Sequence, residues 1–415
     1  MYCVKELRDR VIEKIDVTEE IEDSRIYEII DDVIIEYGKQ KFLSVQRRCE
    51  LKREIYDSIR GLDILEEIMQ DKDITEVMIN GYNNIFIEKK GELIRYNAKF
   101  SSKERLSDVI QQMVSGVNRR VNESSPIVDS RLKDGSRVNI VLNPIAIDGP
   151  VVTIRKFPEH RITMERLIEV NSITKEAAEF LKVLVRSGYN IFISGGTGSG
   201  KTTFLNALSN YIPATERIIT IEDSAELQLQ NIDNLVRLEA RQPNLEGENG
   251  ISIRDLIKSS LRMRPDRIVV GEVRGSEALD MLQAMNTGHD GSLSTGHANS
   301  PGDMLSRLET MVLMGADIPL AAIKSQIAAG LDIIVHLGRL RDRSRKVLEI
   351  VEITGYSNSE IEVNILFKFK ENRKMEDMQG EVKGALVWTG SGLIHTAKLM
   401  NMGFYEEALK YGRSD

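Results

Sequence analysis

The chain contains the nonapeptide Gly195-Gly196-Thr197-Gly198-Ser199-Gly200-Lys201-Thr202-Thr203, which fits the phosphate-loop pattern G-x-x-x-x-G-K-[ST] at every position. The apolar run 190–194 precedes it and predicts a buried strand, and a helical pattern begins at Thr202. Glycines allow a tight turn in which successive backbone N–H groups point at phosphate oxygens, and the helix N-terminus adds partial positive charge. We therefore expect this loop to bind phosphates, with Lys201 on the β- and γ-phosphates and the Thr202 hydroxyl on Mg²⁺.

Composition limits the class of protein. With 415 residues, 41% of them hydrophobic and 29% charged, the chain is long enough for two or three globular domains. The formal net charge of −8 does not favour nucleic acid as a partner. The two cysteines, Cys3 and Cys49, provide neither a disulfide framework nor a metal-ligand spacing, which indicates a reducing compartment. No signal region and no bilayer-spanning apolar run are present in the sequence, so we expect a cytoplasmic protein that meets a membrane through partners.

Changes in residue pattern divide the chain into four segments. In the first, apolar residues recur at spacings of three and four among acidic residues, which predicts amphipathic helices that form a small bundle or a docking module. Packing on the protein itself is favoured over membrane binding, because a membrane-surface helix would be biased to Lys and Arg. In the second, short apolar runs alternate with turn sequences such as Asn80-Gly81, which predicts strands. In the third, strands and helices alternate, which predicts a sheet with substantial parallel content. The expected organisation is an N-terminal helical module (1–60), a smaller α+β domain (61–160), an α/β domain around the phosphate loop (161–355) and a C-terminal tail (356–415).

Finer boundaries follow from the same periodicities. In the tail, alternating apolar residues from Ile361 to Phe369 predict a strand, the charged residues 370–381 a loop, and 399–410 a short helix. In the α/β domain the expected strands are 190–194, 217–221, 235–239, 267–271, 292–295, 331–337 and 347–353, and the expected helices are 201–212, 252–262, 276–286, 301–314 and 319–330.

Two predicted strands end in carboxylates. The strand from Ile268 ends in Gly271-Glu272, and Glu272 is expected to polarise an attacking water or to help hold Mg²⁺ through water. The strand 219–221 is followed by Glu222, Asp223 and Glu226. Three carboxylates so close repel one another unless they are solvated, paired or near a cation, and we expect Mg²⁺ or an arginine beside them. The alternative is that Asp223 or Ser224 caps a helix.

Histidines and arginines supply further candidates. His289 and His297 bracket one predicted strand and could sense a γ-phosphate or link subunits. No third ligand of metal type lies nearby in the sequence, so we exclude a zinc site. Arg131 and Arg137 lie in a turn-rich segment and Arg155 follows a strand. Composition alone leaves open whether these arginines are surface residues or ligands.

Together the motifs resemble the traffic ATPases that power type II secretion, type IV pili and type IV secretion. That family has a phosphate loop, an acidic box, a Walker B strand ending in Gly-Glu and a histidine box, in this order. The corresponding segments here are Gly195–Thr203, Glu222–Glu226, Ile268–Glu272 and His289–His297. Within the family the chain looks like the CpaF branch, the assembly ATPase of tight-adherence (Flp) pili, in the segments Arg131–Arg137, Thr153–Phe157, Leu261–Asp266 and Met281–Asp290. Two cysteines cannot form the tetracysteine zinc module of many extension ATPases, which favours the CpaF or conjugative branches.

The resemblance implies a RecA-like phosphate-loop ATPase domain, ATP and Mg²⁺ as cofactors, and a homo-hexamer that drives an inner-membrane platform protein from the cytoplasmic face. Closure of the N-terminal and C-terminal domains would bring arginines to the phosphates and offset charge in the transition state. Arg237, Arg241, Arg264 and Arg274 are alternatives for the arginine that acts across a subunit boundary. The implied catalytic residues are Lys201, Glu222, Glu272, His297, Arg131 and Arg137, with Arg155 and Gly195–Thr203 on the nucleotide and Thr202, Glu222 and Glu272 at the metal.

Two other functions share some of these features. A hexameric nucleic-acid translocase or helicase would have the same loop, and the basic stretch Arg339–Lys346 is its best support. We interpret that stretch instead as a hairpin turn or a platform-docking surface. A regulator that only binds nucleotide would not need Lys201, Thr202 and Glu272 together. A GTPase is disfavoured because the sequence has no Asn-Lys-x-Asp element for guanine.

Overall fold

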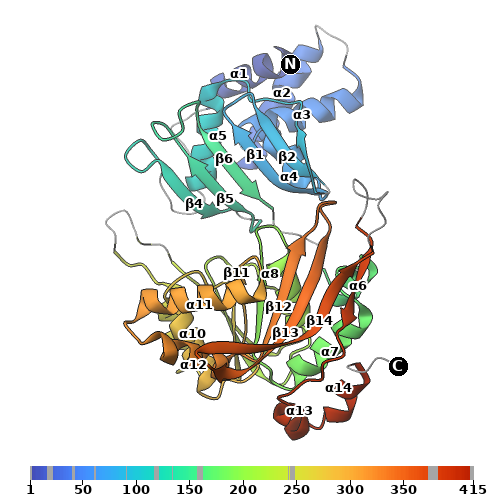
Figure 1. Cartoon of the computed structure of the whole chain (residues 1–415). Coiled ribbons are helices and arrows are strands. Elements are labelled where there is room, and N and C mark those ends of the chain that lie inside the picture. The colour runs from blue at the N-terminus through green and yellow to red at the C-terminus, as the bar shows by residue number, and fades with distance from the viewer. Residues whose placement is uncertain are drawn as a thin grey trace. The chain divides into compact units, whose positions relative to one another are not determined.

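The structure is a computed structural model that describes residues 2–15, 22–39, 43–59, 62–89, 91–115, 121–132, 134–156, 162–241, 243, 248–372 and 382–411. The chain forms two compact units, Met1–Arg161 and Ile162–Asp415 (Figure 1). The expected loop 370–381 falls largely outside the described residues.

The first unit begins with three helices, α1 (Tyr2–Glu13), α2 (Asp23–Gly38) and α3 (Val45–Ile59). They enclose a core of their own, because most of the apolar residues that recur at helical spacing turn inward. In α2 the buried residues are Ile26, Ile29, Ile30, Val33, Ile34 and Tyr37. The helical pattern of the N-terminal segment therefore predicts its structure well.

A six-stranded antiparallel sheet completes this unit, with strand order β3-β2-β1-β6-β5-β4. Its alternating apolar residues pack against the helix α5, which contributes Leu106, Val109 and Ile110 to the same core. The strand β4 was not predicted, because Asp129 and Ser130 are poor strand formers and the segment looks like a turn. The elements are α4 (Ile64–Gln70), β1 (Ile74–Asn80), β2 (Ile85–Lys89), β3 (Glu92–Arg95), α5 (Lys103–Ser115), β4 (Ile127–Arg131), β5 (Arg137–Val141) and β6 (Val151–Arg155).

The second unit is built on a nine-stranded mixed sheet with strand order β15-β14-β13-β12-β7-β11-β10-β8-β9. The six strands from β12 to β9 in that order are parallel, and β13, β14 and β15 continue the sheet antiparallel. The strands are β7 (Ile191–Gly195), β8 (Arg217–Glu222), β9 (Asn234–Glu239), β10 (Arg267–Val270), β11 (Leu293–His297), β12 (Ile333–Arg339), β13 (Arg345–Ser357), β14 (Glu360–Glu371) and β15 (Gly384–Trp388).

Helices cover both faces of this sheet. The first core includes residues of α6, α7, α8, α13 and α14. The second core includes residues of α9, α10, α11 and α12. Strand β7 serves both cores, because Ile191 and Ile193 face the first and Phe192 the second. The helices are α6 (Met164–Glu169), α7 (Lys175–Arg186), α8 (Lys201–Ser209), α9 (Ile253–Ser260), α10 (Glu277–Asn286), α11 (Pro301–Gly315), α12 (Leu320–Gly330), α13 (Ala397–Met402) and α14 (Tyr405–Tyr411).

Every strand and helix predicted for 190–353 is present, with ends that differ by four residues or fewer. The predicted tail strand is β14, whereas β15 was missed. The predicted helix 399–410 is two helices, because Gly403 adopts a φ of 74° that ends α13. Phe367 and Trp388 from the tail pack against Phe180 of α7, so these last strands belong to the core of the unit.

None of the described helices is, by itself, both long and apolar enough to cross a membrane. Within the described part of the chain, one pair, α11 and α12, passes the same test when taken together, but the chain bends by 119° between them. Met304, Leu308, Ile323 and Ile327 from this pair are buried in the core of the second unit.

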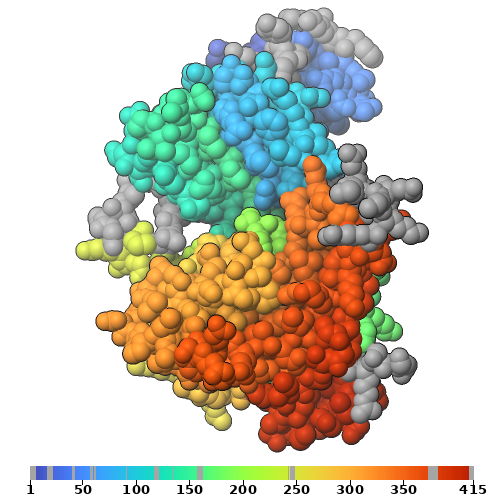
Figure 2. Space-filling view, in the orientation of Figure 1, coloured from blue at the N-terminus to red at the C-terminus, as the bar shows by residue number. Residues whose placement is uncertain are grey.

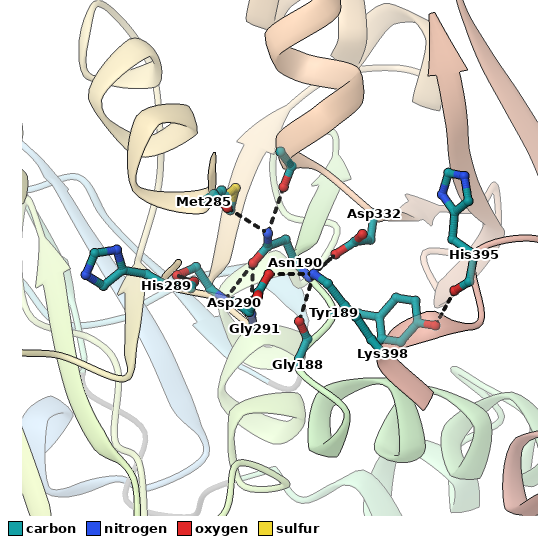
Figure 3. Close-up of polar contacts among 12 residues, drawn as sticks. Gly188, Tyr189, Asn190, Met285, His289, Asp290, Gly291, Asp332, His395 and Lys398 are labelled. Carbon is teal, nitrogen blue, oxygen red and sulfur yellow. Dashed lines mark hydrogen bonds and ion pairs between the residues drawn. The ribbon is translucent and has the colours of Figure 1, made fainter. Parts of the chain in front are cut away.

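Polar contacts fasten the tail to the amino end of β7 (Figure 3). The backbone N–H of Asn190 donates to Asp332 Oδ2 at 2.7 Å, and Lys398 Nζ donates to the same oxygen at 2.7 Å. Lys398 also donates to Gly188 O at 3.1 Å and pairs with Asp290 at 2.7 Å. Burial raises the pKa of Asp332, and Lys398 opposes that rise. The charge on Asp332 therefore depends on a lysine from the tail helix α13.

Lys398→Met is expected to lower the midpoint of thermal unfolding by about 5 °C, because Asp332 would lose its cation, at a cost of about 2 kcal/mol. Circular dichroism at neutral pH measures the midpoint. The matched control is Lys410→Met, which removes an exposed lysine from α14. Equal midpoints for the two variants would contradict the anchoring role of Lys398.

Candidate active site at the phosphate loop

The glycine-rich loop connects the carboxyl end of β7 to the first residue of α8. Gly198 and Gly200 adopt φ values of 70° and 94°, in the left-handed region that glycine tolerates best. A Cβ on Gly195 would lie 2.5 Å from Leu337 O and 2.6 Å from Ser199 Oγ, so no other residue fits there. The loop is thus shaped by its glycines, as the motif predicts.

Lys201 is 7% exposed and lies over this loop. Its Nζ donates to Gly195 O and Gly196 O at 3.1 Å each. Both ring nitrogens of His297 lie 3.4 Å from the same Nζ. Burial lowers the pKa of the Lys201 ammonium, and the negative charge of the nearby Glu272 offsets only part of this decrease. The lysine, the loop carbonyls and His297 therefore form one polar cluster.

Glu272 completes this cluster from the end of β10. Arg274 Nη2 donates to Glu272 Oε2 at 2.8 Å, and His297 Nε2 lies 2.9 Å from Glu272 Oε1. Burial alone would raise the pKa of Glu272, but the hydrogen bond from Arg274 and the charges around it lower that pKa overall. Burial and the charge of Lys201 lower the pKa of His297. An ionised carboxylate beside a neutral imidazole is suited to orienting a water and accepting its proton.

Glu222 at the end of β8 has a different environment. It is 3% exposed, and its Oε1 accepts the backbone N–H groups of Glu226 and Leu227 at 2.8 and 2.9 Å. Its Oε2 is buried without a hydrogen-bond partner among the described residues. Burial raises the pKa of Glu222 to about 7. A Cβ on Gly271 would lie 2.8 Å from Glu222 Cγ, so glycine before Glu272 makes room for this side chain.

The helix-cap interpretation of Asp223 and Ser224 is wrong, because the residues after β8 are irregular and no described helix starts there. The strand β8 is followed by the edge strand β9, and Glu239 of that strand accepts the N–H of Ala225 at 3.2 Å. The acidic segment is therefore an ordered loop whose backbone N–H groups turn toward carboxylates.

Glu222→Gln is expected to stabilise the nucleotide-free chain at alkaline pH. The pKa of Glu222 is about 7 when folded, against an ordinary value of 4.5, so the folded state retains the proton over that interval. The contribution of Glu222 to the free energy of unfolding is therefore complete below its ordinary pKa of 4.5. This contribution is lost as the pH rises through the folded pKa of about 7, and the loss is about 3 kcal/mol at most. The glutamine oxygen can accept the same two N–H groups without ionising.

Thermal unfolding without nucleotide should show the variant about 5 °C above the parent at about pH 8, with a smaller difference at about pH 6. A difference that does not change with pH would mean that Glu222 does not carry the buried charge.

The three candidate arginines lie together in the first unit. In the register of its sheet Arg131 of β4 is opposite Arg137 of β5, and Arg137 is opposite Arg155 of β6. Residues opposite one another share a face with Cβ atoms about 5 Å apart, and like charges there are destabilising. Arg155 Nε lies 3.8 Å from Glu76 Oε1 on β1. A row of three cations at neighbouring strand ends is suited to binding a polyanion.

The structure separates the two histidines of the histidine box. His297 ends β11 beside Lys201, whereas His289 precedes the same strand and lies near Asn190, at the amino end of β7 (Figure 3). The two ends of a strand cannot serve one phosphate, so the prediction that both histidines sense a γ-phosphate is wrong, whereas a role in linking subunits stays a prediction. Arg274, considered as an arginine acting across subunits, contacts Glu272 of its own chain.

Sequence reasoning did not single out α11. A cleft of about 520 Å³ is lined by Gly196, Thr197 and His297 on one side and by residues of α11 that include Asp303 and Arg307. The spacing of four between these last two places them on one helix face. This pattern could have been noticed, because α11 starts soon after His297.

The basic stretch 339–346 is a hairpin turn between β12 and β13, as predicted. Leu340 N donates to Ser344 O at 2.8 Å to close the turn. Arg345 of this hairpin contacts the phosphate loop, because its Nε donates to Gly198 O at 3.0 Å. This contact was not predicted from the sequence. No local signal marks it, because the contact depends on the pairing of β12 with β7.

Comparisons with known proteins agree with this architecture. A putative conjugal transfer protein of Mycobacterium tuberculosis is 34% identical over 304 residues, which cover 72% of this chain and 86% of that protein. The conjugal transfer protein TrbB of Rhizobium radiobacter is 31% identical over 325 residues, which cover 78% of this chain and 96% of that one. The crystal structure of the ATPase DotB from Yersinia pseudotuberculosis matches 70% of this chain and 78% of its own, with a TM-score of 0.52 and 19% identity.

The likeness to DotB concerns the fold, and the predicted α/β ATPase domain preceded by a smaller α+β domain is confirmed. A family model described as "Type II/IV secretion system protein" matches residues 59–383, which is more than half of the chain. Together with relatives above 30% identity that are covered over most of their length, this match fixes the family. The chain belongs to the type II/IV secretion system protein family and is an ATPase.

Proposed function

We propose that this ATPase is the hexameric motor of a pilus-assembly or type IV secretion system. It hydrolyses ATP at Gly195–Thr203, and the resulting motion drives a platform protein in the inner membrane from the cytoplasmic side. The observation that carries the proposal is the convergence of Lys201, Glu272 and His297 at the carboxyl ends of neighbouring parallel strands. Ligands of open α/β sheets bind at that edge.

The residues fit Mg²⁺ as well as the nucleotide. Mg²⁺ keeps several waters and takes one or two protein oxygens beside the phosphates, and Glu222 offers a buried oxygen without a partner in the described chain. Thr202 in the first turn of α8 would bind the ion directly, with Glu222 and Glu272 acting through water. When bound, the ion would neutralise charge on the β- and γ-phosphates.

Each protein group then has one task. Lys201 would leave the loop carbonyls to bind phosphate oxygens, because its buried ammonium already lies 3.1 Å from Gly195 O and from Gly196 O. Glu272 would orient the attacking water and accept its proton, and His297 would hold Glu272 in place. Arg307 lines the cleft beside the loop and is our additional candidate for contact with the γ-phosphate.

Arg131, Arg137 and Arg155 are proposed to act when the N-terminal and C-terminal domains close on the nucleotide. Their row on one face of the β4–β5–β6 sheet supports a common ligand. Cations supplied in this way accelerate phosphoryl transfer in related phosphate-loop enzymes by about 10³- to 10⁵-fold. Opening and closing of the two domains would then follow the hydrolysis cycle.

We propose the CpaF branch rather than the other branches of the family for two reasons. The cysteine count is low, and three segments resemble that branch: Arg131–Arg137, Leu261–Asp266 and Met281–Asp290. The names of the two relatives point instead to conjugal transfer. Both assignments use a homo-hexamer without nucleic acid as a direct partner.

Deleting the gene in its native host distinguishes them. Loss of surface pili with normal DNA transfer would support the CpaF assignment, and the opposite result would support conjugation. Light scattering of the purified chain with ATP and Mg²⁺ should give the mass of six chains. A monomer under all nucleotide conditions, or normal pili and transfer in the deletion strain, would overturn the proposal.

A nucleic-acid motor is the second candidate, because the β12–β13 hairpin carries four arginines and a lysine against one aspartate. Such a motor would bind DNA with a strong salt dependence and hydrolyse ATP faster in its presence. We expect neither, since the net charge of the chain is −8.

A further inference from the structure

The base of the β12–β13 hairpin lies against the phosphate loop. Strand β12 pairs in parallel with β7, with Leu337 opposite Gly195. Two residues beyond, Arg339 faces Arg345 across the hairpin. Arg345 Nε donates to Gly198 O at 3.0 Å, and Arg339 Nη1 lies 3.8 Å from the place of a Cβ on Gly198. Two guanidinium groups therefore border the loop on its β12 side.

The backbone of Arg345 is fixed from several directions. Ser172 Oγ donates to Arg345 O at 2.8 Å, and Val347 N donates to Ser172 O at 2.8 Å. Between them Lys346, which is 7% exposed, donates to Asn171 O at 3.1 Å. Asp342 at the tip accepts the N–H of Val382 at 2.7 Å. A hairpin held at its base and tip positions its arginines better than a free loop would.

The sheet order gives the two sides of the loop different chemistry. Glu272 and His297 come from β10 and β11, which lie on one side of β7, while β12 lies on the other. A nucleotide is linear, with its reacting phosphate at one end and its nucleoside at the other. If the carboxylate side takes the terminal phosphate, the nucleoside extends towards β12.

Both arginines keep donors for a ligand. A guanidinium has five N–H donors, and Arg345 uses its Nε on Gly198. Within the described part of the chain, neither the remaining Arg345 nitrogens nor Arg339 make a hydrogen bond or ion pair. Both side chains are exposed, and the hairpin forms a projection of the second unit (orange in Figure 2).

We propose that Arg345, with Arg339 beside it, binds the nucleoside end of the nucleotide. A guanidinium can stack on the face of a base and donate to ribose hydroxyls. This assignment rests on the proposed nucleotide site at Gly195–Thr203 and adds the residues that recognise the part of the ligand beyond the phosphates. Stacking does not read base identity, so Arg345 contributes equally to adenine and guanine nucleotides.

Calorimetry with two probes separates this role from mere support of the loop. ADP carries a nucleoside and tripolyphosphate does not, and neither demands turnover. Arg345→Ala should raise the Kd for ADP about tenfold and leave the Kd for tripolyphosphate within about twofold. Arg339→Ala should act in the same direction and more weakly. Arg343→Ala at the exposed hairpin tip removes the same charge and should change neither Kd.

Each other outcome has its own meaning. An equal loss for both probes in Arg345→Ala would assign the arginine to loop support and overturn the proposal, as would unchanged affinity for both. Lys201→Ala is the reference for the site, because it should weaken both probes. If that variant bound both normally, the proposed nucleotide site would fail instead. Arg345→Lys, which keeps the charge but loses the planar group, should restore only part of the ADP affinity.

Discussion

Replacing Glu272 with glutamine is expected to lower the rate of ATP hydrolysis by about 10²- to 10⁴-fold while the Kd for ATP stays within about threefold. Glutamine has nearly the shape of glutamate and can still accept the hydrogen bond from Arg274 Nη2, which is 2.8 Å long. It cannot accept a proton from water. The loss should therefore fall on the chemical step rather than on binding.

Steady-state phosphate release gives the rate, and calorimetry gives the Kd. Glu406→Gln is a suitable control, because it makes the same change at an exposed position of α14. Turnover within threefold of the parent in Glu272→Gln would remove Glu272 from the mechanism. A matching loss of ATP affinity would show that the carboxylate mainly shapes the site.

Replacing Lys201 with alanine is expected to weaken ATP and ADP binding by at least about 100-fold and to abolish hydrolysis. The ammonium is the buried cation at the phosphate loop, 3.1 Å from Gly195 O and from Gly196 O. Alanine would remove the charge that faces the β- and γ-phosphates. It would also leave both carbonyls without this donor.

Lys201→Arg provides the matched comparison, because it retains the charge. A side chain that is only 7% exposed leaves little space for a larger planar group, so this variant should also bind poorly. Unfolding midpoints close to the parent would show that both variants fold. Normal ATP affinity in Lys201→Ala would place the nucleotide elsewhere.

Much of this site could be predicted because its signals are local. The loop pattern, the strand before it and the acidic ends of β8 and β10 are each written within a few consecutive residues. Parallel strands then place their carboxyl ends at one edge, which brings Lys201, Glu272 and His297 together.

What could not be predicted depends on pairing between distant strands. Arg131, Arg137 and Arg155 form a row only through the register of β4, β5 and β6, and β4 itself looks like a turn. Arg345 reaches Gly198 across 147 positions of sequence. His289 was grouped with His297 because they are close in sequence, although a strand places them at opposite ends.

The strand β7 has one further consequence. Its amino end carries the Asn190 contacts with Asp332, to which Lys398 of the tail is bonded, and its carboxyl end is Gly195. The strand has five residues, so about 16 Å of extended backbone separates the two ends. It is paired on both sides, with β12 and β11, and resists bending. A force applied to α13 therefore reaches the phosphate loop first through the side chains of Lys398 and Asp332 and then along the paired backbone of β7.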